Sequence, residues 1–255
     1  MIPNFVVDGT NTKTLLIRRI GPALTQFNLR LDVLLQNPTL RLLSGNTVVA
    51  SNTGWSTAPN AAEILTRSVE VGAFALAQSS GDCAMLLSVA PGSYTVQLSG
   101  LNDTTGVGLV EIYDLDETGS SARLVNISTR SQVGTGGDIL IPGYVIHGDV
   151  PRTLLIRAVG PTLGEDFGVA GVLADPTLAV FKENEQIASN DNWGTNANLA
   201  ELQSTTEAVG AFALVSGSKD AAMLITLNPG AYTVQVSGVG STIGLSLVEV
   251  YEIEN

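Results

Sequence analysis

The chain contains the stretch Pro91-Gly92-Ser93-Tyr94-Thr95-Val96-Gln97 and repeats it 138 residues later as Pro229-Gly230-Ala231-Tyr232-Thr233-Val234-Gln235. In the first copy Tyr94, Val96 and Leu98 fall on one side, and polar residues alternate with them. A period of two is typical of a strand with one buried face, and the Pro-Gly pair supplies a turn before it. The stretch therefore predicts one β-strand in each of two copies of a β-domain.

The duplication extends over most of the chain. Residues 37–113 and 175–251 align without a gap and share 37 identities in 77 positions. Further upstream, residues 14–18 match residues 153–157. Self-similarity of this length is the signature of a tandem repeat, in which each copy folds as a structural unit.

We predict two domains, repeat 1 at 1–117 and repeat 2 at 118–255. The segment 118–140 has no counterpart before the first copy, so repeat 1 is expected to lack its first strand. The segment 122–130 is then either the first strand of repeat 2 or a strand lent to repeat 1. Either the chain is a piece of a longer array, or the first domain completes its sheet differently. We expect repeat 1 to have an unprotected sheet edge, which can template strand addition.

The predicted fold class is all-β, with two homologous β-sandwich domains of the jelly-roll type and one short helix in each. Short apolar or alternating segments, separated by turns rich in Gly, Asn and Ser, indicate about seven or eight strands per copy. The helices are expected at 61–69 and 199–207, because an Asn precedes a Glu by three residues at each start. This spacing, seen for Asn60 and Glu63, resembles a capping box.

Composition excludes several classes of protein. Of the 255 residues, 44% are hydrophobic and 14% are charged, so the chain can bury enough apolar surface to fold. The net charge of −12 argues against nucleic-acid binding, which needs a basic face. No apolar run approaches the roughly 18 residues of a membrane span, and no signal segment opens the chain.

A single cysteine and a single histidine leave little material for catalysis. Cys83 aligns with Ala221 and His147 aligns with Asp8, so neither belongs to a repeated site. A metal cluster or a Cys–His nucleophile needs several such groups in one place. We therefore expect no catalytic residue and no internal disulfide.

Two opposite charges recur inside apolar strands. Arg18 matches Arg157, and Glu111 matches Glu249. A charge among core positions is costly unless it has a partner. We predict structural ion pairs between Arg18 and Glu111 and between Arg157 and Glu249. The alternative is that the arginines hold an anionic ligand.

Oxygen-bearing side chains gather in the second copy at Asn190 and Asp191. Such side chains suit calcium, which takes 6–8 oxygen ligands. Asp175 and Asp220 complete the predicted metal ligands if the fold brings them near. Because the first copy has Asn37 in place of Asp175, any calcium site is expected to be stronger in repeat 2. The alternative is a turn whose side chains bond their own backbone.

The two tryptophans follow these polar loops. Trp55 and Trp193 occupy matching positions, three residues after Asn52 and Asn190. On exposed loops the four residues would form ligand-binding sites, with the rings stacking on sugars. A tryptophan that recurs in both copies fits a core anchor equally well.

The run Asp175-Pro176-Thr177-Leu178, the loop at Asp191 and the strand at 229–234 together resemble the bacterial pre-peptidase C-terminal type of module. The first copy has the same layout at 37–52 and 91–96. The unit is also similar to uncharacterised repeats near the ends of large secreted bacterial proteins. The resemblance implies an extracellular, non-catalytic β-sandwich appendage, sometimes calcium-bound, that binds matrix or polysaccharide or spaces other domains.

The function expected from these features is a non-catalytic extracellular or cell-surface module for binding, adhesion or spacing. Its expected partners are a polysaccharide or an extracellular matrix or surface protein, with no nucleic acid and no membrane span. One alternative is a hydrolase whose acidic site lies between the modules and uses Asp149, Asp166 or Asp191. Another is an array element that assembles into homo-oligomers by strand exchange at an open sheet edge.

Overall fold

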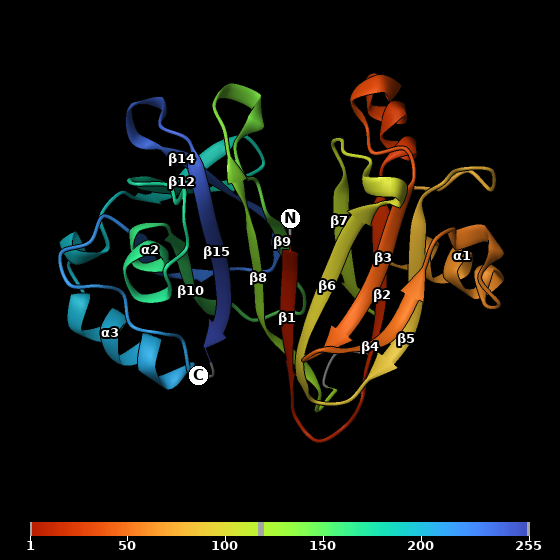
Figure 1. Ribbon diagram of the computed structural model, residues 1–255. Coiled ribbons are helices and arrows are strands. Elements are labelled where there is room, and N and C mark those ends of the chain that lie inside the picture. The colour runs from red at the N-terminus through yellow and green to blue at the C-terminus, as the bar shows by residue number, and fades with distance from the viewer. Residues whose placement is uncertain (1, 117–119, 254–255) are drawn as a thin grey trace. The chain divides into compact units, whose positions relative to one another are not determined.

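The computed structural model describes residues 2–116 and 120–253, and nearly all of its regular structure is β. Figure 1 shows the antiparallel strands and the few short helices. The chain divides into two compact units, a first unit at Ile2–Leu124 and a second unit that begins at Val125. The all-β sandwich prediction is confirmed.

The second unit is a complete jelly roll. Its strands form the sheet β13-β10-β15-β8 and the sheet β12-β11-β14-β9, with antiparallel pairing throughout. Numbered from one to eight within the unit, these orders are 6-3-8-1 and 5-4-7-2, the arrangement of two interlocked Greek keys. The strands are β8 (Arg123–Val133), β9 (Gly143–Ile146), β10 (Arg152–Val159), β11 (Pro176–Lys182), β12 (Glu185–Asn190), β13 (Ala221–Leu227), β14 (Gly230–Gly238) and β15 (Gly244–Ile253).

The first unit has the same topology with one strand fewer. Its sheets are β1-β6-β3-β4 and β5-β2-β7, so β7 takes the place of β15 and ends its sheet. Among the described residues of this unit, no strand corresponds to β8. The strands are β1 (Ile2–Asp8), β2 (Lys13–Ile20), β3 (Pro38–Ser44), β4 (Thr47–Asn52), β5 (Cys83–Val89), β6 (Gly92–Gly100) and β7 (Leu109–Asp114).

Each unit buries two apolar clusters. One lies between the sheets and contains Tyr94 and Val96 in the first unit, or Tyr232 and Val234 in the second. The other lies on the outer face of one sheet, beneath the predicted helix, and contains one of the two tryptophans. No helix in the described part of the chain is long and apolar enough to cross a membrane.

The helices agree with the sequence in part. α1 (Ala61–Glu70) and α3 (Leu199–Ala208) form where they are predicted, each extending one residue further. The prediction of one helix per unit is wrong for the second unit, which also has α2 (Pro161–Phe167). The corresponding segment of the first unit, Pro22–Phe27, is a 3-10 helix.

One extra residue explains the difference between these two segments. Each runs from a Pro to a Phe that packs edge-on against a second ring, Phe27 on Phe74 and Phe167 on Phe212. In the second unit the Phe lies six residues after Pro161, whereas in the first unit it lies five residues after the Pro. A 3-10 helix rises about 2.0 Å per residue and an α-helix about 1.5 Å, so the shorter segment covers a similar distance in the 3-10 form.

The predicted capping boxes are also wrong, since neither Asn makes a side-chain hydrogen bond that caps its helix. The Asn60 amide donates instead to the Leu86 carbonyl (3.3 Å). The Asn198 amide donates to the Glu201 carboxylate (3.3 Å). The φ of about −107° and ψ of 28° at Asn60 differ from the extended backbone that a capping side chain requires.

A buried aspartate ties distant segments together in both units. The Asp220 carboxylate accepts the backbone N–H groups of Gly160 (2.7 Å) and Thr162 (3.2 Å), together with the hydroxyls of Thr162 and Ser218. Its own backbone carbonyl accepts the N–H of Trp193 (2.8 Å). One residue therefore holds the start of α2 and the tryptophan loop against the start of β13.

Asp82 repeats this role with fewer bonds. Its carboxylate accepts the N–H groups of Gly21 (2.7 Å) and Ala23 (3.2 Å). Its carbonyl accepts the N–H of Trp55 (2.9 Å). Ala23 stands where the second unit has Thr162, so the hydroxyl donor at that position is missing.

These contacts predict unequal losses of stability. Asp220→Ala leaves four buried donor groups without their acceptor and should lower the free energy of unfolding of the second unit by about 3–5 kcal/mol. Asp82→Ala leaves two and should cost the first unit about 2–3 kcal/mol. Urea unfolding followed by fluorescence in Trp55→Phe and Trp193→Phe backgrounds assigns each loss to its unit. Equal losses would contradict this account.

Candidate functional site

The candidate site is a groove in the first unit, between β4 and β5. These strands are the edges of opposite sheets, so the groove runs along one open side of the sandwich. Its volume is about 330 Å³. The lining residues come from β4, the segment after it, and β5: Ala50, Ser51, Asn52, Thr53, Thr57, Ala58, Pro59, Asn60, Ala84, Met85, Leu86 and Leu87.

Asn52 forms part of the wall and joins the two sheets. Its Oδ1 accepts the N–H groups of Gly54 (3.1 Å) and Ala84 (3.1 Å). Asn190 repeats the bridge in the second unit, where its Oδ1 accepts the N–H of Ala222 (3.0 Å). The amide oxygens that the sequence suggested for ligand binding are therefore already bonded to backbone.

The tryptophans lie in the core. Trp55 is 3% exposed and Trp193 is 6% exposed. The indole N–H of Trp55 donates to the Ala77 carbonyl (3.1 Å), and that of Trp193 donates to the Ser218 hydroxyl (3.1 Å). Neither ring has a free face on which a sugar could stack, and both serve as core anchors.

The groove is uncharged. No lining residue is acidic, basic or aromatic. Its polar rim carries the hydroxyls of Ser51, Thr53 and Thr57, all of which are exposed residues. Its apolar part comes from Met85 and Leu87 on β5 and from Pro59. This surface offers neutral hydrogen-bonding groups next to small apolar contacts.

Three of the four predicted calcium ligands, Asp220, Asp175 and Asn190, have other partners. The Asp220 carboxylate is filled by the donors described above. Asp175 forms an ion pair with Lys219, and this contact, with a further contribution from Asp191, raises the pKa of Lys219. Asn190 bridges the sheets through its Oδ1. The described residues contain no group of three or more His, Cys, Asp or Glu side chains able to hold a metal ion.

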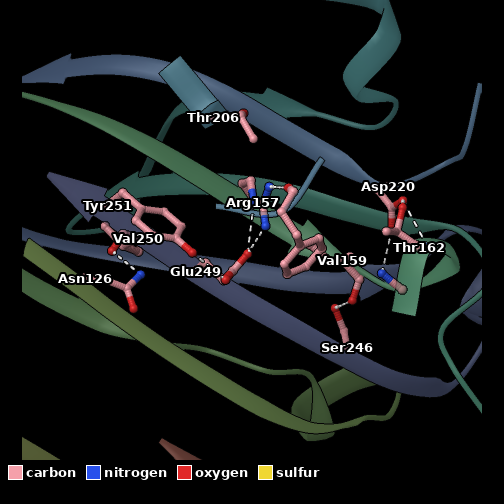
Figure 2. Close-up of polar contacts among 12 residues, drawn as sticks. Asn126, Arg157, Val159, Thr162, Thr206, Asp220, Ser246, Glu249, Val250 and Tyr251 are labelled. Carbon is pink, nitrogen blue, oxygen red and sulfur yellow. Dashed lines mark hydrogen bonds and ion pairs between the residues drawn. The ribbon is translucent and has the colours of Figure 1, made fainter. Parts of the chain in front are cut away.

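The structure brings Arg157 and Glu249 together in the second unit (Figure 2). The Arg157 guanidinium is fully buried; its Nε and Nη2 donate to Glu249 Oε2, and its Nη1 donates to the Phe212 carbonyl (2.6 Å). It also lies 4.3 Å from the centre of the Phe212 ring. Tyr251 donates its hydroxyl to Glu249 Oε1 (2.7 Å), and burial together with this carboxylate raises the pKa of Tyr251.

Arg18 and Glu111 form the matching cluster in the first unit with poorer geometry. Arg18 Nε lies 3.1 Å from Glu111 Oε2, and the guanidinium lies 4.7 Å from the Phe74 ring centre. None of the three guanidinium nitrogens of Arg18 makes a hydrogen bond within the described part of the chain. Because Arg18 and Arg157 are both fully buried, neither is accessible to an anionic ligand.

The other candidate catalytic residues are dispersed. Burial raises the pKa of the Cys83 thiol to about 12, and its Sγ donates to the Pro38 carbonyl (3.0 Å), so it is no nucleophile. His147 is exposed on the second unit. Asp149, Asp166 and Asp191, suggested for a hydrolase, are also exposed residues of that unit.

Sequence reasoning missed a second buried cation. Lys13 is 3% exposed, and its Nζ lies 2.7 Å from Asp114 and 3.2 Å from Asp116. Its counterpart Arg152 pairs with Glu252 (3.2 Å). Opposite charges at matching strand ends in both repeats were the signal that could have revealed these pairs.

Comparisons with known proteins find only distant similarity. No family model and no curated protein matches the chain. The pre-peptidase C-terminal domain of a Bacillus anthracis collagenase matches with 14% identity and a TM-score of 0.29, covering 49% of this chain and 89% of that one. PNGF-II matches with 9% identity and a TM-score of 0.25 over 98% of this chain and 60% of its own.

A third solved structure, VP54 of PBCV-1, matches with 9% identity and a TM-score of 0.21, covering 99% of this chain and 92% of that one. The resemblance to the pre-peptidase C-terminal domain is therefore a distant one. It is a resemblance of fold only, and it extends along about half of the chain. At these values the comparisons carry no argument about function.

The two arginine clusters predict different sensitivities. Glu249→Gln leaves the fully buried Arg157 charge without its carboxylate and should lower the free energy of unfolding of the second unit by about 3–5 kcal/mol. Glu111→Gln should cost the first unit less, about 1–2 kcal/mol, because Glu111 makes no hydrogen bond to Arg18. Thermal or urea unfolding checks both variants, and a larger loss for Glu111→Gln would refute the ranking.

Proposed function

We propose that the chain is a non-catalytic binding module of an extracellular or cell-surface protein, and that the groove between β4 and β5 holds its ligand. The observation that carries the proposal is an open, uncharged groove of about 330 Å³ along the side of the sandwich. Its two walls are fixed to each other by the Asn52 bridge, so the groove is largely formed before a ligand arrives.

The lining favours a neutral, hydroxyl-rich ligand. Hydroxyl and amide groups can exchange hydrogen bonds with sugar hydroxyls, whereas an ionic ligand would meet no countercharge in the groove. Leu87 and Pro59 give apolar contacts beside these polar groups. We therefore propose a neutral polysaccharide chain as the ligand class.

We propose a calcium site only in the second unit, beside Lys219. Asp175 and Asp191 both act on Lys219, so a cation there must displace the Lys219 ammonium group. Lys219→Ala should then increase any rise in melting temperature that millimolar calcium causes. If calcium raises the melting temperature of neither protein, calcium has no part in the function.

The binding test is a glycan and matrix-protein screen of the full chain, with and without calcium. Ser51→Arg places a charged, bulky side chain on the exposed rim of the groove. It should weaken binding of a neutral glycan by about tenfold or more, which is about 1.4 kcal/mol. The matched control is Ser189→Arg, the exposed counterpart in the second unit, which should leave binding unchanged.

Each outcome of the screen decides part of the proposal. Loss of glycan binding in Ser51→Arg alone supports the groove of the first unit. Loss in Ser189→Arg alone moves the site to the second unit and refutes the assignment. Binding of matrix protein without any glycan refutes the ligand class, and failure to bind anything leaves the spacer function expected from the sequence.

A further inference from the structure

A second surface of the first unit, distinct from the groove, is the outer edge of β7. In the second unit β8 lies along β15, in a register that pairs Val248 with Thr129 and Ser246 with Ser131. In the first unit β7 corresponds to β15, and it pairs with β2 alone among the described strands. No strand among the described residues takes the position of β8 beside β7, so the outer edge of β7 is unpaired within them.

The backbone of β7 leaves its outward groups free for pairing. The Leu115 N–H donates to the Thr14 carbonyl (3.0 Å), which places Leu115 and every second residue before it in bonds to β2. Hydrogen-bonding direction alternates along an antiparallel strand. The N–H and C=O groups of Val110 and Ile112 therefore point away from β2, to the open edge.

Two residues near this edge differ from their counterparts in the second unit. Arg19 stands where the second unit has Ala158, on the inner face of the sandwich beside Val110. Its guanidinium lies over Gly108, where a Cβ atom would be only 3.2 Å from both Cζ and Nη2. Gly108 replaces Ser246 of the second unit, and this loss of a side chain makes room for the guanidinium.

Arg19 has no partner at this place. The residue is 7% exposed, and its Nε makes no hydrogen bond. Among the described residues no carboxylate pairs with it, and burial lowers its pKa. A largely buried guanidinium whose Nε has no acceptor is costly, so a strand that brought a carboxylate to it would gain from both the pairing and the edge.

We propose that the open edge of β7 binds an extended segment of a partner protein, antiparallel and in the register of β8, with a carboxylate at the position of Ser131. That position faces Ser246 in the second unit, so in the first unit it faces Gly108 and the Arg19 guanidinium above it. The mode is β-strand addition: backbone bonds to Val110 and Ile112 give affinity, and the carboxylate gives specificity.

Charge argues that the occupant is a partner and not a second copy of this chain. β8 is the strand of this chain with the right register, but it carries Arg123 and Arg130 and no acidic residue. At Ser131 it would offer only a hydroxyl to Arg19. An acidic segment therefore fits the edge better than β8 itself.

The test uses the full chain and an 11-residue peptide with the sequence of β8. A peptide with Ser131→Glu should bind about tenfold more tightly than the matched Ser131→Gln peptide, as measured by calorimetry. Hydrogen exchange should show new protection at the amides of Val110 and Ile112. In the protein variant Arg19→Ala, which restores the residue of the second unit, the preference for Glu should disappear.

Two further peptides test the register without altering the protein. Thr129→Pro removes an N–H that would face β7 and should abolish binding, whereas Arg130→Pro removes one that would face away and should be tolerated. Three results would each overturn the proposal. The two proline peptides could bind equally, the hydrogen-exchange protection could be confined to β15, or the unmodified β8 peptide could bind as tightly as the Glu peptide.

Discussion

Backbone groups at a strand edge need hydrogen-bond partners, and this constraint shapes the two units more than any other. In the second unit β8 pairs along β15, so β15 has a neighbouring strand on both sides. The first unit repeats the fold with seven strands, and its sheet ends at β7. Near that edge Arg19 and Gly108 stand where the second unit has Ala158 and Ser246, and Gly108 leaves room for the Arg19 guanidinium.

The duplicated polar network shows the same asymmetry. In the second unit Arg157 bonds Glu249 and a backbone carbonyl, and Asp220 is filled by four donors. In the first unit Arg18 lies near the Glu111 carboxylate without a hydrogen bond to it, and the Asp82 carboxylate has two donors. The two copies therefore keep the same buried charges, but the first copy satisfies them less completely, consistent with its shorter sheet.

Much of the architecture could be predicted from the sequence, because alternation and internal repetition are local signals. They indicated the sandwich, the two helices and the neighbours of Arg157. The positions of tertiary contacts were harder to predict: Asp220 resembled a calcium ligand because linear sequence shows its oxygens but not the N–H groups around it. The capping boxes failed for the same reason, since the amide of Asn60 bonds a neighbouring strand. The groove could not be predicted, because it exists only where two sheet edges meet.

The aspartates that precede β5 and β13 have a consequence for local motion. Asp220 bonds the start of α2 through its carboxylate and the loop of Trp193 through its carbonyl, two segments that are about thirty residues apart in the chain. Because both segments contact the same residue, displacement of Asp220 would loosen both, and we expect this end of the sandwich to open cooperatively. Both loops should therefore resist proteolysis until this end of the sandwich unfolds, although each loop lies at the surface.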